Sequence, residues 1–294
     1  MPQIALAAFL KRLRLRSDLD EEEANAILSM EGRVEQRGRG DDIVLRGDRT
    51  THASLIVDGL AARYDQTDSG ARQYTALHIP GDMCDLHSAV LPVATWGIEA
   101  LNPVTILRVP HAALLAAASD YPAIAHAFWR DTTADAGILS KWVGNLGRKT
   151  AIARMAHLFC EIGTRMEHAG LGTRTEFAMG LTQEQLADAL GLTSVHVNRT
   201  LQTLRAERLV RTEYKKIEIL DWDGLATCAD FQEDYLQYIR QPTRVPEAPV
   251  YNMARAGALS SLGRPGPGAV RRAGHRPAAV SLLKPMAEHP PKAD

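Results

Sequence analysis

Short segments of partly alternating apolar and polar residues, separated by glycines, fill the first half of the chain. The glycines lie 12, 11 and 11 residues apart, at Gly47, Gly59, Gly70 and Gly81. Segments 52–57, 73–78, 95–100 and 104–109 read as strands, and residues 20–28 predict a short helix before them. Short strands at such regular spacing predict a sandwich or barrel, for which a jelly roll is the natural form.

After Pro110 the spacing of the apolar residues lengthens, and no proline occurs from Ala123 to Leu146. Apolar or small residues alternate at spacings of three and four, at Trp129, Thr132, Ala136, Leu139, Val143 and Leu146. This spacing is the a/d seam of a coiled coil. It predicts a long helix over residues 121–147 through which two copies dimerise. A helix packed on its own sheet would give a similar pattern, and this alternative stays open.

Residues 148–225 predict helices followed by a hairpin. Thr182 and Gln185 form a capping box that begins one helix. Gly191 ends that helix, and Thr193 caps the next one. Two short helices joined by a tight glycine turn form a helix-turn-helix, whose second helix enters the major groove of DNA. The residues expected to face inward are Leu186, Leu190, Val197, Leu201 and Leu204.

The exposed side of the second helix and the hairpin after it carry the candidate DNA contacts. Short polar side chains beside an arginine suit base edges and phosphates. Residues 209–220 predict strand, turn and strand, a wing whose basic residues reach the phosphate backbone. A helical hairpin without a DNA role is the alternative. The expected contacts are Thr182, Thr193, Ser194, Val195, His196, Asn198, Arg199, Thr200, Arg211, Lys215 and Lys216.

The chain resembles the Crp/Fnr superfamily of transcription regulators, including a subgroup common in alphaproteobacteria. The resemblance covers about residues 25–225 and is strongest at Gly81-Asp82, at Trp142–Leu146 and in the helix-turn-helix. It implies an α+β fold with an N-terminal β jelly roll of the cyclic-nucleotide-binding type, a long dimerisation helix and a C-terminal winged helix-turn-helix. It also implies three partners, which are operator DNA, a second copy of the chain and RNA polymerase.

The resemblance further implies roles within the second helix of the motif. Arg199 matches an arginine that reads a guanine of each half-site, and Asn198 and Val195 occupy the other base-facing positions. Typical members carry glutamate where this chain has Val195, so the usual half-site sequence does not carry over.

An effector in the roll is implied but not identified. Cyclic-AMP receptors hold the phosphate in a cassette with Gly-Glu and Arg-Ser pairs. Residues 83–98 contain neither pair, and no arginine lies between Arg72 and Arg108, so we do not expect cyclic AMP. The absence of cysteine before Cys84 argues against an iron–sulfur cluster. Haem binding with His87 as a ligand remains an alternative, although the cysteine expected two positions earlier is missing. An apolar or ligand-free pocket is the favoured interpretation.

Composition adds the remaining bounds. The 294 residues suffice for two domains, and the net charge of −1 does not by itself indicate a nucleic-acid binder. Three cysteines without a CxxC pair predict neither disulfides nor zinc. We find no Walker loop, HExxH or GxSxG, so we do not expect an enzyme. No apolar run reaches membrane length, and the first sixteen residues are not ordered like a secretory signal. We therefore expect a cytoplasmic protein without a membrane partner.

The expected domains are a roll over residues 1–120, the dimerisation helix over 121–147, the winged helix-turn-helix over 148–225 and an extension over 226–294. The extension is proline-rich and basic, and its composition predicts disorder from about residue 241. The expected function is that of a homodimeric transcription regulator that binds a palindromic operator under the control of an effector. A haem- or cyclic-nucleotide-responsive module of the same fold that acts through a protein partner is the alternative.

Overall fold

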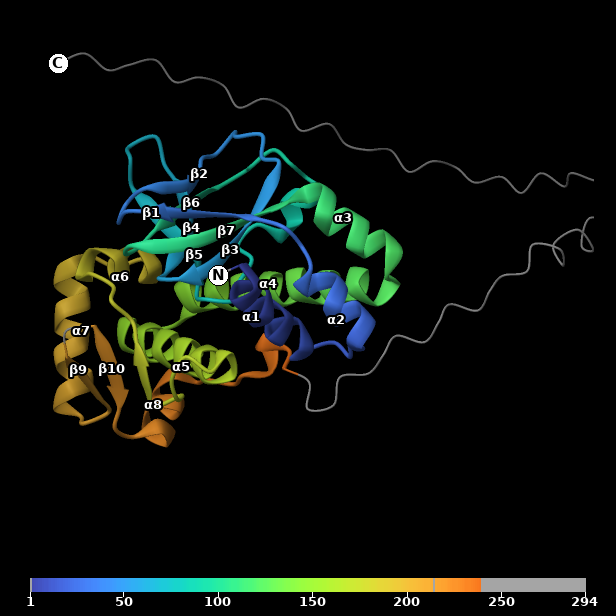
Figure 1. Ribbon diagram of the computed structural model, residues 1–294. Coiled ribbons are helices and arrows are strands. Elements are labelled where there is room, and N and C mark those ends of the chain that lie inside the picture. Colours follow the sequence, from blue (N-terminus) through green and yellow to red (C-terminus); the bar gives the residue numbers. More distant parts are fainter. Residues whose placement is uncertain (1, 214, 239–294) are drawn as a thin grey trace, which may run out of the picture. The chain divides into compact units, whose positions relative to one another are not determined.

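The computed structural model describes residues 2–213 and 215–238, so the prediction of disorder from about residue 241 lies outside the described residues. Two helices precede the first strand, α1 (Pro2–Arg14) and α2 (Glu21–Leu28) (Figure 1). The short helix predicted over 20–28 is α2, and Asp20 caps it. The sequence analysis did not predict α1.

Two antiparallel sheets form a β-roll, which confirms the predicted jelly roll. One sheet has the strand order β1-β7-β3 and the other β2-β6-β4-β5. All four regularly spaced glycines adopt positive φ angles between 85° and 94°, which glycine accepts without steric cost. The strands are β1 (Arg33–Arg37), β2 (Asp42–Val44), β3 (His52–Asp58), β4 (Ala61–Gln66), β5 (Arg72–His78), β6 (Gly97–Ala100) and β7 (Val104–Pro110). A short 3-10 helix, η1 (Leu86–Ala89), lies between β5 and β6.

The first helix packs against the roll through its apolar face. Leu6, Phe9 and Leu13 of α1 are buried in one cluster with Leu55 of β3 and Leu107 of β7. Because these side chains lie three and four residues apart, they share one side of the helix. The apolar face of α1 therefore belongs to the core of the roll.

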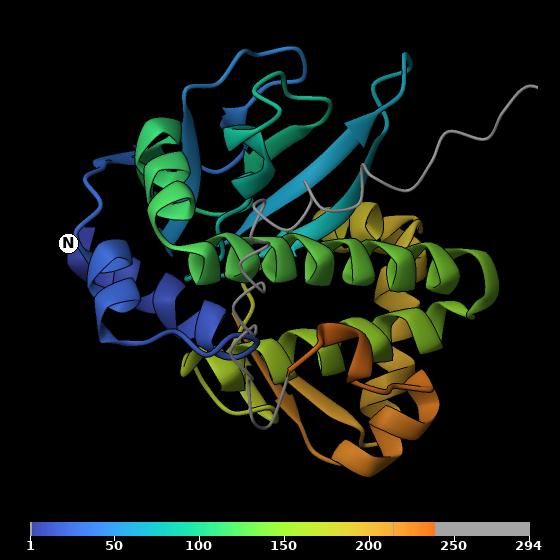
Figure 2. The same cartoon turned by 90° about the vertical axis from the view of Figure 1, so that its right-hand side faces the viewer.

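The helix α4 (Pro122–Arg148) follows α3 (His111–Asp120) and has two distinct faces. One face is buried and contacts β5 and α1 (Figure 2). The predicted seam lies on the other side, where Trp129 is 72% and Val143 is 62% exposed. Ala136 is also exposed, and Thr132, Leu139 and Leu146 are half-buried. The helix thus packs on its own roll and still presents the seam to solvent. Dimerisation itself stays a prediction.

The C-terminal part contains three further strands and several helices. Its three-stranded sheet has the order β8-β10-β9. One apolar cluster joins this part to the roll, since Tyr74 and Leu77 of β5 pack with Phe159, Leu186 and Leu190. No helix among the described residues is long and apolar enough to span a membrane. The elements are α5 (Ala151–Ala169), β8 (Glu176–Ala178), α6 (Gln183–Leu190), α7 (Ser194–Ala206), β9 (Val210–Glu213), β10 (Lys216–Ile219), α8 (Trp222–Ala229) and the 3-10 helix η2 (Asp234–Leu236).

Candidate functional site

Side-chain caps position the helix-turn-helix as the sequence predicted. Thr182 Oγ1 accepts a hydrogen bond from the Gln185 backbone at 3.1 Å, and Gln185 Oε1 accepts one from the Thr182 backbone at 2.9 Å. Gly191 ends α6 at φ 60°, in the left-handed region. Thr193 Oγ1 then accepts from the His196 backbone at 3.3 Å and begins α7. These local bonds fix the angle at which α7 leaves the turn.

The exposed face of α7 carries most of the side chains expected to contact DNA. Val195 is 67% exposed, and Ser194, Asn198 and Arg199 are exposed beside it. These four residues line an open hollow of about 320 Å³ together with Gln183 and Gln202. Gln202 follows Val195 by seven residues and lies on the same face. The sequence analysis missed both glutamines, although the spacing pointed to Gln202.

Thr200 corrects one part of this prediction. It was expected on the exposed side, but it is only 5% exposed and its hydroxyl donates to the His196 carbonyl at 2.7 Å. Residue 200 follows the buried Val197 by three positions and precedes Leu201, so it lies on the inward side of α7. His196 itself is exposed, and its Nδ1 lies 3.2 Å from Thr193 Oγ1.

The wing forms where the sequence placed it, as β9 and β10. Arg211 contacts Glu218 at 2.7 Å, and Lys216 contacts Glu176 at 2.6 Å. Lys215 is exposed in the turn just before β10. Exposed ion pairs of this kind contribute little to stability.

The roll holds the first helix of the motif directly. Gln73 of β5 donates from Nε2 to the Asp188 carbonyl at 2.7 Å, near the end of α6. Gln185 donates in the other direction, to the Leu101 carbonyl at 2.8 Å. The last carbonyls of a helix lack partners inside the helix. The side chain of Gln73 supplies one, and the helix-turn-helix is thereby fixed to the roll.

His87 lies in η1, half-buried, with its ring centroid 4.9 Å from that of Trp96. Burial lowers the pKa of His87. The guanidinium of Arg63 lies 5.0 Å from the Trp96 ring, and its Nη2 has no hydrogen-bond partner among the described residues. The sequence argument weighed only arginines near residues 83–98 and so missed Arg63, which enters from β4. Within the described ranges, no group of three or more His, Cys, Asp or Glu side chains is placed to hold a metal ion.

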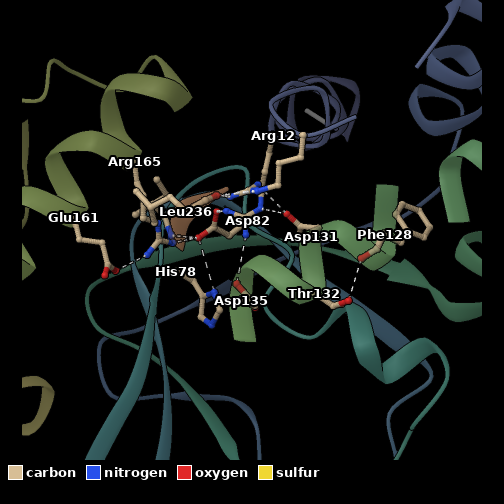
Figure 3. A network of polar contacts seen from close by, with 12 residues as sticks. Arg12, His78, Asp82, Phe128, Asp131, Thr132, Asp135, Glu161, Arg165 and Leu236 are labelled. Carbon is tan, nitrogen blue, oxygen red and sulfur yellow. Dashed lines mark hydrogen bonds and ion pairs between the residues drawn. The ribbon is translucent and has the colours of Figure 1, made fainter. Parts of the chain in front are cut away.

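A buried ionic node connects four parts of the chain (Figure 3). Asp82, after β5, accepts hydrogen bonds from Arg12 of α1 and from Arg165 Nη2 of α5, the latter at 2.6 Å. Arg12 Nε donates to Asp131 of α4 at 2.8 Å, and Arg165 Nη1 donates to Glu161 at 3.4 Å. Burial alone would raise the pKa of Asp82, but Arg12 and Arg165 hold it below its usual value. Of these residues, the sequence singled out only Asp82.

Comparison with known protein families finds two matches in this chain. Residues 35–121 match the model of the cyclic nucleotide-binding domain, and residues 153–228 match that of the Crp-like helix-turn-helix domain. The first match covers β1 to β7 and α3, and the second covers α5 to α8. The two matches therefore coincide with the β-roll and the candidate DNA interface.

Individual relatives agree with these matches. The chain is 21% identical over 220 residues to the transcriptional activator protein FnrA of Stutzerimonas stutzeri, covering 75% of this chain and 90% of the relative. It is 27% identical over 168 residues to the nitrogen fixation regulation protein FixK of Azorhizobium caulinodans, covering 57% and 65%. Among solved structures it resembles FixK2 from Bradyrhizobium japonicum, with a TM-score of 0.61 and 23% identity over 68% of this chain and 98% of that one. This last likeness shows the fold.

The segment after Asp82 lacks the Gly-Glu and Arg-Ser pairs that the resemblance associates with a cyclic phosphate. A cyclic phosphate needs a cation and hydrogen-bond donors in the segment after Asp82. That segment forms η1, where His87 packs on Trp96. Arg63 lies over the same Trp96 ring. The His87 and Trp96 rings are tilted by 52° to each other, and Arg63 is the arginine that lies beside them.

Proposed function

Because the chain belongs to the Crp/Fnr family of transcription regulators, with FixK-like relatives in alphaproteobacteria, we propose that it binds a palindromic operator as a homodimer through α7. The observation that carries the proposal is the exposed face of α7 with Val195, Asn198 and Arg199 beside one hollow. Arginine donates two hydrogen bonds to guanine O6 and N7, and asparagine pairs in the same way with adenine. Contact with RNA polymerase follows from the same role.

The seam of α4 supports the homodimer. Its residues are exposed or half-buried although they are apolar or small, whereas the other face of the helix is buried in the same chain. A second copy that packs its α4 against this seam would cover Trp129, Leu139 and Val143. A two-fold dimer places two α7 helices on half-sites about one helical turn of DNA apart. The operator is therefore proposed to be a palindrome.

An effector in the roll is proposed to tune this activity. The support is the cluster of Arg63, His87 and Trp96 beside η1, where Arg63 Nη2 lacks a partner among the described residues. Haem ligation by His87 stays a prediction.

The operator proposal is tested by selecting binding sites from random DNA with the wild-type chain, Arg199→Ala and Lys215→Ala. Arg199→Ala should lose the preference for one G·C pair in each half-site, a contact worth about 1–3 kcal/mol. Lys215→Ala should weaken binding to all DNA sequences alike, because a phosphate contact carries no sequence information. Arg39→Ala, on the exposed surface of the roll, is the control. An unchanged motif with both α7 and wing variants would contradict the proposal.

A further inference from the structure

We propose that a cavity beside Asp82 binds a small apolar monocarboxylate. The cavity has a volume of about 160 Å³ and lies between α1, the turn at residues 79–82, α5 and Tyr238. It is separate from the cluster around His87 and from the hollow beside α7. Its inner end is the ionic node of Figure 3, since Arg12, Asp82 and Arg165 all line it.

The walls of the cavity come from elements far apart in the sequence. Ala5 and Ala8 of α1 lie on one side, and Ile79 and Val57 of the roll form another. Lys11 Nζ donates to the Ala169 carbonyl at 2.9 Å and joins α1 to the end of α5 at the edge of the cavity. Concave sites with apolar walls and a few convergent polar groups are the usual form of small-molecule sites.

One nitrogen of Arg165 that is unpartnered in the described part of the chain, and not the net charge, is the feature that favours an anion. The lining contains two arginines, Arg12 and Arg165, and the carboxylate of Asp82, while Asp131, Asp135 and Glu161 pair with the same arginines from outside the lining. Arg165 is only 3% exposed, and its Nε has no hydrogen-bond partner among the described residues. A buried donor without an acceptor costs free energy, and a guanidinium pairs best with a carboxylate. A ligand carboxylate beside Arg165 would supply the missing acceptor.

The volume sets the size of the rest of the ligand. An engineered apolar cavity of about 150 Å³ in another protein holds benzene. The cavity here is of similar volume, and leucine, isoleucine, valine and alanine side chains form most of its walls. The ligand class is therefore a monocarboxylate with an aromatic or branched aliphatic body of six to eight non-hydrogen atoms, on the order of one benzene ring.

A ligand bound in the cavity would affect the helix-turn-helix through Arg165. This residue belongs to α5, which packs on α6 and α7, and its bond to Asp82 ties α5 to the roll. A ligand carboxylate would compete with Asp82 for the same guanidinium. This consequence rests on the proposed function, whereas the binding site does not.

The test is calorimetric titration of the full chain with benzoate, and with benzamide as the uncharged analogue. We expect saturable one-to-one binding of benzoate and at least tenfold weaker binding of benzamide. Ala8→Leu fills the cavity and should weaken benzoate at least tenfold, whereas Ala7→Leu, on the exposed side of α1, should leave its affinity unchanged. Leu171→Trp at the rim is a second filling variant, because Leu171 is 42% exposed and tolerates a larger side chain.

Absence of benzoate binding at millimolar concentration would overturn the proposal, as would undiminished binding in both filling variants. Operator affinity is then measured with and without benzoate. Benzoate binding by a chain that binds no DNA would leave the cavity assigned and refute the proposed function. Operator binding by a chain that does not bind benzoate would support the proposed function and refute the assignment of the cavity.

Discussion

His157 shows how a single buried side chain makes the stability of this chain depend on pH. Its ring stacks on Tyr235 at 5.7 Å and meets Phe231 edge-on at 5.3 Å. Its Nε2 has no hydrogen-bond partner among the described residues. Burial, reinforced by the positive charges of Lys149 and Lys141, lowers the pKa of His157 to about 3.

We predict that His157→Phe reduces the loss of stability in acid. The ordinary pKa of histidine is 6.5, so below that pH the unfolded chain takes up a proton that the folded chain refuses until about pH 3. Stability is therefore full above pH 6.5 and falls through this window, by about 2 kcal/mol for this group at pH 5. Urea unfolding at pH 7 and pH 5 measures the difference. An identical difference in both proteins would refute the prediction.

Residues whose partners lie within four positions were predictable. Thr182, Gln185 and Thr193 were recognised because capping bonds span three residues. Arg12 and Asp82 were not paired, since they lie 70 residues apart and no local pattern records such a contact. Thr200 was misplaced because polarity was weighed above its helical position.

At the level of elements, α4 combines two periodic patterns in one helix. Ile124, Ala127, Ile138 and Trp142 lie on the face buried in the same chain. Seam residues such as Leu139 and Val143 lie on the other side. From the sequence, two alternatives stayed open for this helix, namely dimerisation with a second copy and packing on the sheet of the same chain. The structure shows the packing, and it leaves the seam uncovered for a second copy.

We predict that Leu139→Asp combined with Val143→Asp gives monomers in analytical ultracentrifugation. Two buried carboxylates facing each other across a two-fold axis would repel and would lack partners. Leu139→Ile combined with Val143→Ile keeps the seam apolar and should remain dimeric. Dimers with full DNA binding in the aspartate variant would show that the seam is not the interface.

Four strands of the roll, the wing and the helix-turn-helix were predictable because glycine turns and capping boxes mark their ends, whereas β1, β2, β4 and β8 were not predicted. The first helix was not, because its apolar residues 4–10 form a nearly continuous run before the basic ones. Only contact with the roll shows that Leu6, Phe9 and Leu13 share a buried side. The spacing of the apolar residues of α1 can be read from the sequence, but the surface of the roll against which they pack cannot.

At the scale of the whole molecule, the ionic node determines how the parts are held together. Arg12 and Arg165 share Asp82, and the three side chains are between 2% and 11% exposed. Among the described residues, Asp82 is the one carboxylate that pairs with both arginines, so its loss breaks a buried ionic link between α1 and α5. The sequence could not reveal the node, because its members come from α1, the roll, α4 and α5.

We predict that Asp82→Asn lowers the free energy of unfolding by about 3–5 kcal/mol, because Arg12 and Arg165 lose their shared carboxylate. The matched control is Asp65→Asn, which breaks the pair with Arg46 at 3.3 Å, where both side chains are at least 66% exposed. That change should cost less than about 1 kcal/mol. Urea unfolding measures both. Equal losses in the two variants would show that the node does not stabilise the fold.

The position of Arg16 has a consequence for the order of events during synthesis. This buried side chain donates to the Leu236 carbonyl at 2.8 Å, across 220 residues of chain. A ribosome adds about 5–20 residues per second, so Arg16 waits roughly 10–45 s for its acceptor. The apolar side of α1 can pack earlier, because its partners lie on β3 and β7. The contact of Arg16 with Leu236 therefore forms only after the helix-turn-helix has emerged.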